Sequence, residues 1–300
     1  MRGQSDHTYR SQPVEVGGTA AIPQCYCSPE SRHRLPPIRP FLKWAGGKRI
    51  LVSNILPLIP NSFRRYYEPF LGGGALFFAL QPENALLSDN NHELINCYLQ
   101  VRDHCEKVVA RLKLLRNQER DYYRIRGRVP GDEIGRAARL IYLTTLSFNG
   151  IHRLNQRGEF NVPYGYKLHI EPCDTQKLRR ASAALATARL EWKDFEPVVS
   201  SADEGDVVYL DPPYTVSHGN NGFLKYNAKI FSWNDQLRLS NVARSLASRG
   251  CKVIVSNADH PSILRLYRGF AVLKVSRPSV IAASGGFRRQ ITEYIFYNEG

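Results

Sequence analysis

The most informative stretch of this 300-residue chain is Asp206-Val207-Val208-Tyr209-Leu210, followed at once by Asp211-Pro212-Pro213-Tyr214. The run from Val207 to Leu210 is apolar, with β-branched and aromatic side chains, and predicts a buried parallel strand. Two successive prolines can neither continue a strand ladder nor lie inside a helix, so the strand ends in a rigid turn. A carboxylate and an aromatic ring are then fixed at the carboxyl end of a strand, where open α/β sheets bind their ligands.

This turn offers hydrogen-bond acceptors and a flat ring. Prolines have no N–H, and we expect the carbonyls of Pro212 and Pro213 to point outward beside the Asp211 carboxylate. Such a set suits an amino group that donates hydrogen bonds while its ring stacks on Tyr214. The alternative is a proline-stiffened loop with a solvated aspartate, which the other motifs along the chain disfavour.

Positive charge is concentrated in one part of the chain. Lys and Arg exceed Asp and Glu by 14 overall, and a net +8 of that excess falls between Arg111 and Arg180. A basic surface can serve solubility alone, but such clustering is typical of a protein that binds nucleic acid.

The cysteine spacing and the lack of long apolar stretches argue against a metal-binding protein and a membrane protein. Cys25 and Cys27 have the wrong spacing for a zinc knuckle, and the other cysteines are scattered, so we expect reduced thiols, a cytoplasmic protein and no metal site. No apolar stretch is long enough to cross a membrane. Residues 1–38 contain several prolines and no apolar period, which predicts a disordered extension.

Two glycine-rich motifs precede the central strand. Phe41-Leu42-Lys43-Trp44-Ala45-Gly46-Gly47-Lys48 is not a phosphate-binding loop, because Leu42 stands where that motif needs its first glycine and Arg49 where it needs Ser or Thr. Glu68-Pro69-Phe70-Leu71-Gly72-Gly73-Gly74 links an aromatic strand to a helix. Glycines at such a turn let the backbone approach a ligand closely, which favours a cofactor site, although similar turns also occur without a ligand.

The next short strand that we predict is Ala85-Leu86-Leu87-Ser88-Asp89, and it ends in an acidic residue. In dinucleotide-binding folds, the acid at the end of the second strand binds ribose hydroxyls, and its separation from the glycines is similar here. The alternative for Asp89 is that it caps the helix beginning near Asn91.

Residues from about 93 to 174 differ in character, with amphipathic helices and many arginines. Beyond the helices, the segment from Phe148 to Gly165 is rich in Asn, Arg and Gly around a hairpin-like turn. These residue types suit base edges and phosphates, and they are also ordinary turn residues. After the central turn, a capping box at Ser232 and Asp235 starts a helix, and a strand follows from Cys251. The alternation of helices and strands predicts an α/β fold with a mainly parallel sheet.

Taken in order, these motifs resemble the Dam-like family of DNA adenine-N6 methyltransferases over roughly residues 39–300. The resemblance rests on Phe41–Lys48, Glu68–Gly74, Asp89, Phe148–Gly165 and Asp211–Tyr214, whose joint occurrence in this order is specific. It implies an S-adenosylmethionine-dependent enzyme with a seven-stranded, mostly parallel methyltransferase sheet. It also implies an inserted, mainly helical target-recognition domain at residues 93–174, between the parts of the catalytic domain at 39–92 and 175–300.

The resemblance also implies residue roles. The catalytic residues are Asp211, Pro212, Pro213 and Tyr214. The cofactor-binding residues are Trp44, Lys48, Glu68, Pro69, Phe70, Gly72, Gly74, Asp89, Asp194, Phe195 and Asp211. The DNA-binding residues are Lys43, Phe148, Asn149, Ile151, Arg153, Asn155 and Pro163, with Phe148 filling the gap left by an extruded base.

The chemistry expected of these residues needs neither a metal nor a covalent intermediate. Asp211 and the Pro212 carbonyl each accept a hydrogen of the adenine amino group, and Tyr214 stacks on the extruded base. Double-stranded DNA is the expected partner and GATC the expected target, and a cognate restriction endonuclease is a candidate second partner. Tyr166-Lys167 and the stretch from Thr215 to Tyr226 depart from the family pattern, so another short adenine-containing site is an alternative. An RNA adenine methyltransferase and a catalytically inactive nucleic-acid-binding protein of the same fold are further alternatives.

Overall fold

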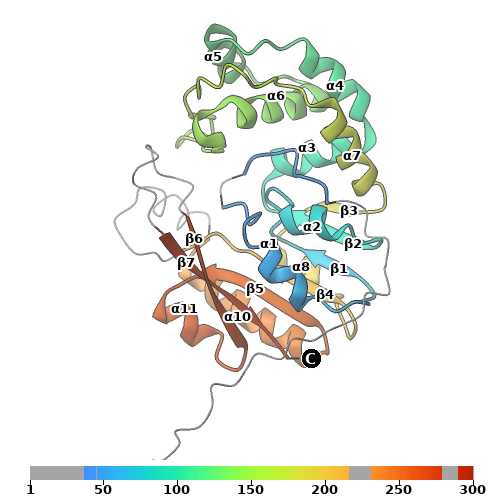
Figure 1. Cartoon of the computed structure of the whole chain (residues 1–300), viewed down its shortest axis with the longest axis vertical. Helices are drawn as coiled ribbons and strands as arrows, with labels where there is room; N and C mark the ends of the chain where they lie inside the picture. Colours follow the sequence, from blue (N-terminus) through green and yellow to red (C-terminus); the bar gives the residue numbers. More distant parts are fainter. Residues whose placement is uncertain (1–36, 45, 216–230, 279–289, 300) are drawn as a thin grey trace, which may run out of the picture. The chain divides into compact units, whose positions relative to one another are not determined.

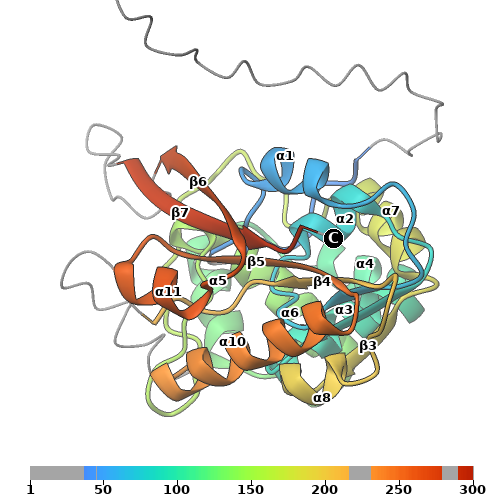
Figure 2. The same ribbon diagram turned by 90° about the horizontal axis from the view of Figure 1, so that it is seen from below.

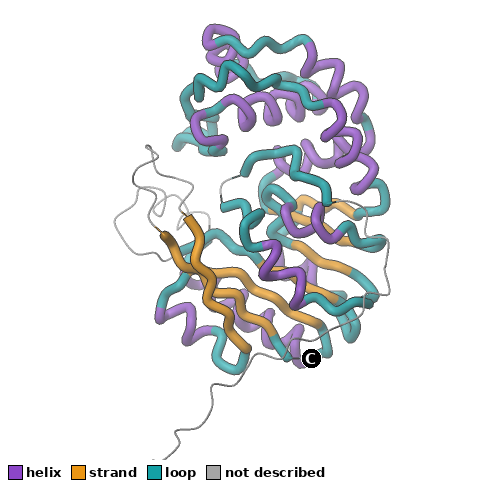
Figure 3. The backbone as a smooth tube through the Cα atoms, in the orientation of Figure 1, coloured by secondary structure: helices purple, strands orange, loops and turns teal. Residues whose placement is uncertain are grey.

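The computed structural model describes residues 37–44, 46–215, 231–278 and 290–299, and within them the chain forms a seven-stranded sheet (Figures 1 and 3). The strand order is β3-β2-β1-β4-β5-β7-β6. The strands are β1 (Tyr66–Glu68), β2 (Ala85–Asp89), β3 (Arg189–Trp192), β4 (Val207–Leu210), β5 (Lys252–Ala258), β6 (Ala271–Pro278) and β7 (Gln290–Tyr297). Strands β1 to β5 pair in parallel, whereas β7 runs antiparallel to both of its neighbours. The expected α/β fold with a mostly parallel seven-stranded sheet is confirmed.

Helices cover both faces of the sheet, as Figure 2 shows. Strand β4 is buried along its whole length, with Val207 and Tyr209 in one hydrophobic cluster and Val208 and Leu210 in the other. This alternation explains why the central strand reads as a continuous apolar run. The first cluster includes residues of α1 (Val52–Ile55), η1 (Leu56–Leu58, packed at its edge), α2 (Ala75–Leu80) and α3 (His92–Asp103), and the second includes residues of α8 (Phe195–Val199), α10 (Trp233–Ser248) and α11 (Pro261–Leu266).

The segment between β2 and β3 is mainly helical. It contains α3, α4 (Cys105–Lys113), α5 (Glu119–Gly127), α6 (Glu133–Leu146), η2 (Phe148–Gly150) and α7 (Thr175–Leu185). Helix α6 packs on α3, α4 and α5, and α3 also contacts β2 and β3. Helix α3 therefore contacts both the sheet and the other helices of this segment. The domain boundary that we predict between residues 92 and 93 falls at the start of this helix.

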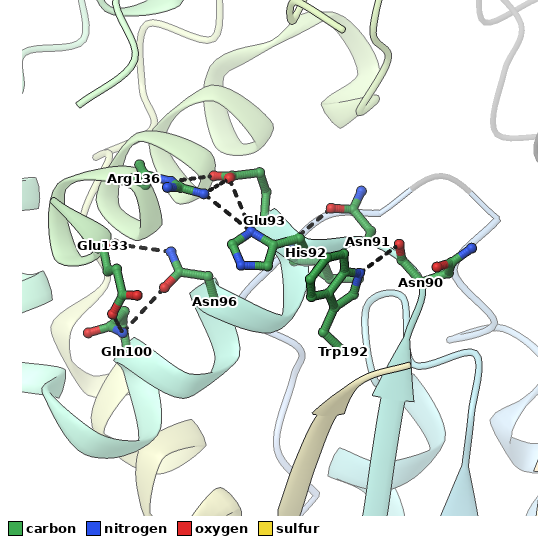
Figure 4. A network of polar contacts seen from close by, with 10 residues as sticks. Asn90, Asn91, His92, Glu93, Asn96, Gln100, Glu133, Arg136 and Trp192 are labelled. Atoms are coloured by element: carbon green, nitrogen blue, oxygen red, sulfur yellow. Dashed lines mark hydrogen bonds and ion pairs between the residues drawn. The ribbon is translucent and has the colours of Figure 1, made fainter. Parts of the chain in front are cut away.

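A polar network ties this helical segment to the edge of the sheet (Figure 4). Arg136 of α6 donates to the carboxylate of Glu93, and Asn96 of α3 donates to the Glu133 carbonyl at 3.1 Å. At the ends of β2 and β3, the Trp192 indole N–H donates to the Asn90 carbonyl at 3.3 Å. His92 connects the two groups, because its ring nitrogen lies 3.2 Å from the Arg136 guanidinium group and its ring packs edge-on against Trp192 with centres 4.7 Å apart.

The predicted extension at residues 1–38 lies outside the described residues, except for its last two. Ile38 is only 9% exposed, and its backbone N–H donates to the Phe78 carbonyl at 3.2 Å. The boundary that we predict at residue 38 is therefore too late, because Ile38 belongs to the folded core. Of the helices that the structure describes, none is both long and apolar enough to cross a membrane.

Candidate active site

The ends of four parallel strands place acidic side chains along one edge of the sheet. Strand β1 ends in Glu68, β2 ends in Asp89, and Asp194 and Asp211 follow β3 and β4 closely. Strands β1 and β4 are neighbours, and the chain continues from them toward opposite sides of the sheet. This is the switch point at which open α/β sheets bind ligands.

Lys48 joins the two polar side chains of the proline turn. Its ammonium group lies 2.9 Å from Asp211 Oδ1 and 4.5 Å from the centre of the Tyr214 ring, and it also donates to the Gly46 carbonyl at 3.0 Å. Lys48 is 5% exposed and Asp211 16% exposed. An ion pair this well buried is only weakly screened, so Lys48 balances the Asp211 charge and fixes its direction.

Two further carboxyl groups lie near this turn. Glu68 is buried, and burial together with the nearby Asp211 raises its pKa to about 8, although a hydrogen bond of 2.8 Å from the Tyr66 hydroxyl partly offsets the shift. Glu68 is therefore mostly neutral at pH 7. Glu293 of β7 lies beside Tyr214, and burial with this carboxylate and Asp211 raises the Tyr214 pKa well above its ordinary value.

The glycine turn packs around Trp44 and is held by Asp89. A Cβ atom on Gly72 would lie 3.1 Å from the Trp44 ring, and the φ angle of Gly72 is +47°, so both packing and backbone favour glycine. The Gly72 N–H donates to Asp89 Oδ2 and the Asn91 N–H donates to Asp89 Oδ1, each at 3.0 Å. Asn91, not Asp89, caps α3, because its side chain accepts from the Leu94 N–H. Burial raises the Asp89 pKa to about 6, although these amides oppose the shift.

An aromatic group lies next to the glycine turn. The Phe70 ring stacks on Phe195 with centres 5.3 Å apart, and Arg238 lies 4.4 Å above the Phe195 ring centre. The same arginine donates to Asp194 Oδ2 at 2.9 Å, and Asp194 caps α8. Phe70 is therefore brought together with Asp194 and Phe195, which are far from it in sequence, and the Phe195 ring itself is buried.

One expectation about the proline turn is wrong. We expect both proline carbonyls to point outward, but the Pro213 carbonyl accepts a hydrogen bond of 3.4 Å from Gln236, a side chain with no exposed surface. The Pro213 carbonyl is thus directed into the protein because a donor on α10 lies beneath the turn.

The segment after α6 packs directly on the first glycine motif. The His152 ring stacks on Trp44 with centres 4.6 Å apart and an interplanar angle of 17°. A Cβ atom on Gly150, whose φ is +66°, would lie 2.7 Å from the Lys43 side chain, so glycine is required for this contact. Burial lowers the His152 pKa to about 4, so the stacked ring is neutral at pH 7.

The hairpin-like turn is present and exposes most of the residues expected to bind DNA. Leu154 and Phe160 form an antiparallel bridge, and the side chains of Lys43, Phe148, Asn149, Arg153 and Pro163 are exposed. Ile151 is half-buried against the core. Asn155 uses its amide oxygen to accept from the Arg157 and Glu159 N–H groups and its amide nitrogen to donate to Glu159. Asn155 is therefore a turn-forming residue in this structure, which is the alternative that its residue type allows.

Comparison with known proteins gives this geometry its context. Residues 44–281 match the D12 class of N6 adenine-specific DNA methyltransferases. The chain belongs to this family. It is therefore an adenine-specific DNA methyltransferase, as the motifs predict.

Relatives of the methyltransferase align along nearly their whole length. The Type II methyltransferase M1.LlaDCHI of Lactococcus lactis subsp. cremoris is 38% identical over 276 residues, which cover 88% of this chain and 96% of the relative. The Type II methyltransferase M.MjaIII of Methanocaldococcus jannaschii is 34% identical, with 87% and 99% covered. A DNA adenine methylase of Vibrio cholerae is 32% identical, with 86% and 95% covered.

Some residues that shape the site of the methyltransferase carry no local signal. Lys167 donates to the carbonyls of Thr145 at 3.0 Å and Ser147 at 2.7 Å. It therefore binds the carboxyl end of α6, just before the segment from Phe148 to Gly165, which we call the recognition segment. Burial and nearby Lys43 lower the Lys167 pKa to about 8. Glu293 reaches Tyr214 only because β7 inserts between β5 and β6. A buried acid within an apolar strand is the one feature that could have drawn attention to Glu293.

Proposed function

We propose that the methyltransferase uses S-adenosylmethionine to methylate N6 of an extruded adenine in double-stranded DNA, with GATC as its target. The observation that carries this proposal is the turn from Asp211 to Tyr214, where a buried lysine holds the carboxylate beside an aromatic ring at the switch point of the sheet. A DNA substrate also supports the expected cytoplasmic location.

The residues around the glycine turn fit this cofactor. The Asp89 carboxylate accepts backbone N–H groups from Gly72 and Asn91, with the Asn90 N–H also directed to it, and its two oxygens keep the capacity for a further hydrogen bond, which suits ribose hydroxyls. The half-buried Phe70 ring, which packs on the buried Phe195, offers apolar surface for a purine, and Asp194 lies next to it in the structure. S-adenosylmethionine supplies a methyl group on a positively charged sulfur. We assign its contacts to Trp44, Lys48, Glu68, Pro69, Phe70, Gly72, Gly74, Asp89, Asp194, Phe195 and Asp211.

The catalytic turn would act by orienting and polarising the target amino group. The lone pair of that nitrogen is delocalised into the purine ring, so the free base is a poor nucleophile. Asp211 and the Pro212 carbonyl would each accept one of its hydrogens and favour a pyramidal nitrogen with a directed lone pair. The carboxylate also stabilises the positive charge that develops on this nitrogen, and the face of Tyr214 stabilises charge spread over the stacked ring.

We assign recognition of the DNA target sequence to the recognition segment together with Lys43. The Arg153 Nε donates to Asn161 Oδ1 at 2.8 Å, which orients the guanidinium group and leaves its two terminal nitrogens for a paired contact with guanine. Phe148 is 41% exposed, unusual for a phenylalanine, which suits an aromatic wedge. Lys43, Asn149, Ile151 and Pro163 complete the proposed set, whereas Asn155 shapes the turn that presents them.

Two relatives are named Type II methyltransferases, which supports a cognate restriction endonuclease as a second partner of this enzyme. Other relatives are named DNA adenine methylases.

The test is expression in a host that lacks adenine methylation, followed by single-molecule sequencing of its genome. We expect N6-methyladenine concentrated in GATC, and none in a strain that expresses Asp211→Ala. Methylation concentrated in any other motif would overturn the GATC assignment. Transfer of labelled methyl groups from the cofactor to RNA but not to DNA would overturn the assignment of the substrate.

A further inference from the structure

The proline turn cannot be anchored in the ordinary way. Pro212 and Pro213 have no backbone N–H, so the hydrogen bonds that fix most tight turns are missing at two successive positions. At these two positions the backbone offers only carbonyl oxygens, which need donors from elsewhere in the protein. In this structure, Gln236 Nε2 donates to the Pro213 carbonyl at 3.4 Å and to Thr215 Oγ1 at 3.1 Å.

Gln236 occupies a position where the helix pattern calls for an apolar residue. Along α10, Gln236, Leu239, Ala243 and Leu246 form one buried stripe, and none of these four side chains is exposed. Burying a primary amide is costly unless its donors and acceptor are paired. Here the amide is paired on both sides, since its oxygen accepts from Asn257 Nδ2 at 3.0 Å.

Asn257 determines which way the Gln236 amide faces. Asn257 lies on β5 with no exposed surface, and its Oδ1 accepts from the Ala258 N–H at 2.8 Å. Because Oδ1 is turned to this N–H, Nδ2 is turned to Gln236, which must then present its own oxygen to Asn257 and its nitrogen to the turn. The order of donors and acceptors therefore runs from the β5 backbone through two side chains to the Pro213 carbonyl.

We propose that Gln236 is a positioning residue for methyl transfer, which holds the turn from Asp211 to Tyr214 in its reactive geometry, with Asn257 fixing the direction of the Gln236 amide. This inference rests on the proposed function, because it concerns the same turn. The reaction depends on a few directed contacts, and a displacement of about 1 Å in such contacts can cost on the order of a hundredfold in rate.

The experiment compares Gln236→Glu, Asn257→Asp and Ser240→Ala. Glutamate keeps an acceptor for Asn257 but has no donor for the Pro213 carbonyl. Aspartate at position 257 still accepts from the Ala258 N–H, but it turns a second acceptor toward Gln236, whose amide must rotate and aim its oxygen at the turn. Ser240 is the matched control, because it is a buried polar residue on the same helix that donates to Leu237 and does not contact the turn.

Three measurements are made on each full-length protein: melting temperature, cofactor affinity by calorimetry, and the single-turnover rate of DNA methylation. A fourth is the fluorescence of DNA with 2-aminopurine at the target position, which reports base extrusion without turnover. For Gln236→Glu and Asn257→Asp we expect single-turnover rates lower by about 10- to 100-fold. We also expect a smaller fluorescence gain, and cofactor affinity within about twofold of wild type. Ser240→Ala should keep the wild-type rate.

A residue that only supports packing would lower the melting temperature and leave the single-turnover rate of the folded protein unchanged. A folded Gln236→Glu or Asn257→Asp protein with a wild-type rate would overturn the inference. If Gln236→Glu does not fold, Asn257→Asp decides alone, since it does not touch the turn. Methylation by the wild-type protein and by Ser240→Ala tests the proposed function separately. A failure of the proposed function can therefore be distinguished from a failure of the inference about Gln236.

Discussion

Asp89 should make cofactor binding depend on pH, and removing its charge should abolish that dependence. Its two oxygens hold the Gly72 and Asn91 amides at 3.0 Å each, and its pKa in the protein is about 6. The ionised form is the better acceptor for ribose hydroxyls, so affinity should rise as the pH increases through about 6 and level off above 7. In Asp89→Asn, one oxygen becomes a donor that faces a backbone N–H, and the charge is lost. Hydrogen bonds to a charged group contribute about 1.5–3 kcal/mol each, which corresponds to a loss of affinity of about 10- to 150-fold.

The assay is calorimetric titration of S-adenosylmethionine at several pH values between about 5 and 8, with wild type, Asp89→Asn and Asp203→Asn. Asp203 is a suitable control because its carboxylate also accepts from a backbone N–H, that of Glu204, but it precedes β4 at the opposite edge of the sheet. We expect the control to follow wild type. An Asp89→Asn protein that is folded and binds the cofactor with wild-type affinity and wild-type pH dependence would refute the assignment of Asp89.

Three further predictions concern the other carboxyl groups and the recognition segment. Asp211→Ala should abolish methyl transfer while leaving the fold and much of the cofactor affinity intact, and near-normal single-turnover rates would contradict the mechanism. Glu68 has a pKa of about 8 in the folded protein and an ordinary value of 4.5, so the stability that it contributes is complete below pH 4.5 and is lost as the pH rises to about 8. Denaturant unfolding should therefore show that wild type loses stability across this range by up to about 1.4 kcal/mol per pH unit more than Glu68→Gln does, and parallel pH profiles would exclude a buried neutral Glu68. Arg153→Ala should cost about 1–3 kcal/mol and relax the choice of base at one position of the target, whereas equal weakening at all sequences with a smaller salt slope would identify a phosphate contact.

The amino-acid sequence predicts those parts of the site that depend only on residues adjacent in the chain. The proline turn, the glycine turn and the acid at the end of β2 each follow from the behaviour of adjacent residues, and the sheet brings them to one edge. The parallel order of the central strands follows from alternation of helices and strands. The position of β7 between β5 and β6 has no such local origin, and the sequence analysis does not predict it.

Contacts between distant segments could not be predicted. Lys48 meets Asp211, and Gln236 meets Pro213, only after the sheet has formed and α10 has packed on it. For the same reason, the outward direction expected of the Pro213 carbonyl was wrong, since the donor that draws it inward lies on another element. Asn155 shows a different limit, because its residue type suits both a turn and a base edge. Its bonds to Arg157 and Glu159 show the role in the turn, whereas contact with DNA stays a prediction.

The stacking of Trp44 on His152 has a thermodynamic consequence. Trp44 lies against the glycine turn on one side and against the recognition segment on the other, so anything that fixes its ring biases both. If Trp44 contacts the cofactor and the recognition segment contacts DNA, as proposed, occupancy of the two sites would be linked, and linkage is reciprocal: the factor by which cofactor tightens DNA binding must equal the factor by which DNA tightens cofactor binding. Replacing His152 with alanine should reduce both factors together. The protein would then capture its two substrates almost independently, although every residue that touches either of them is unchanged.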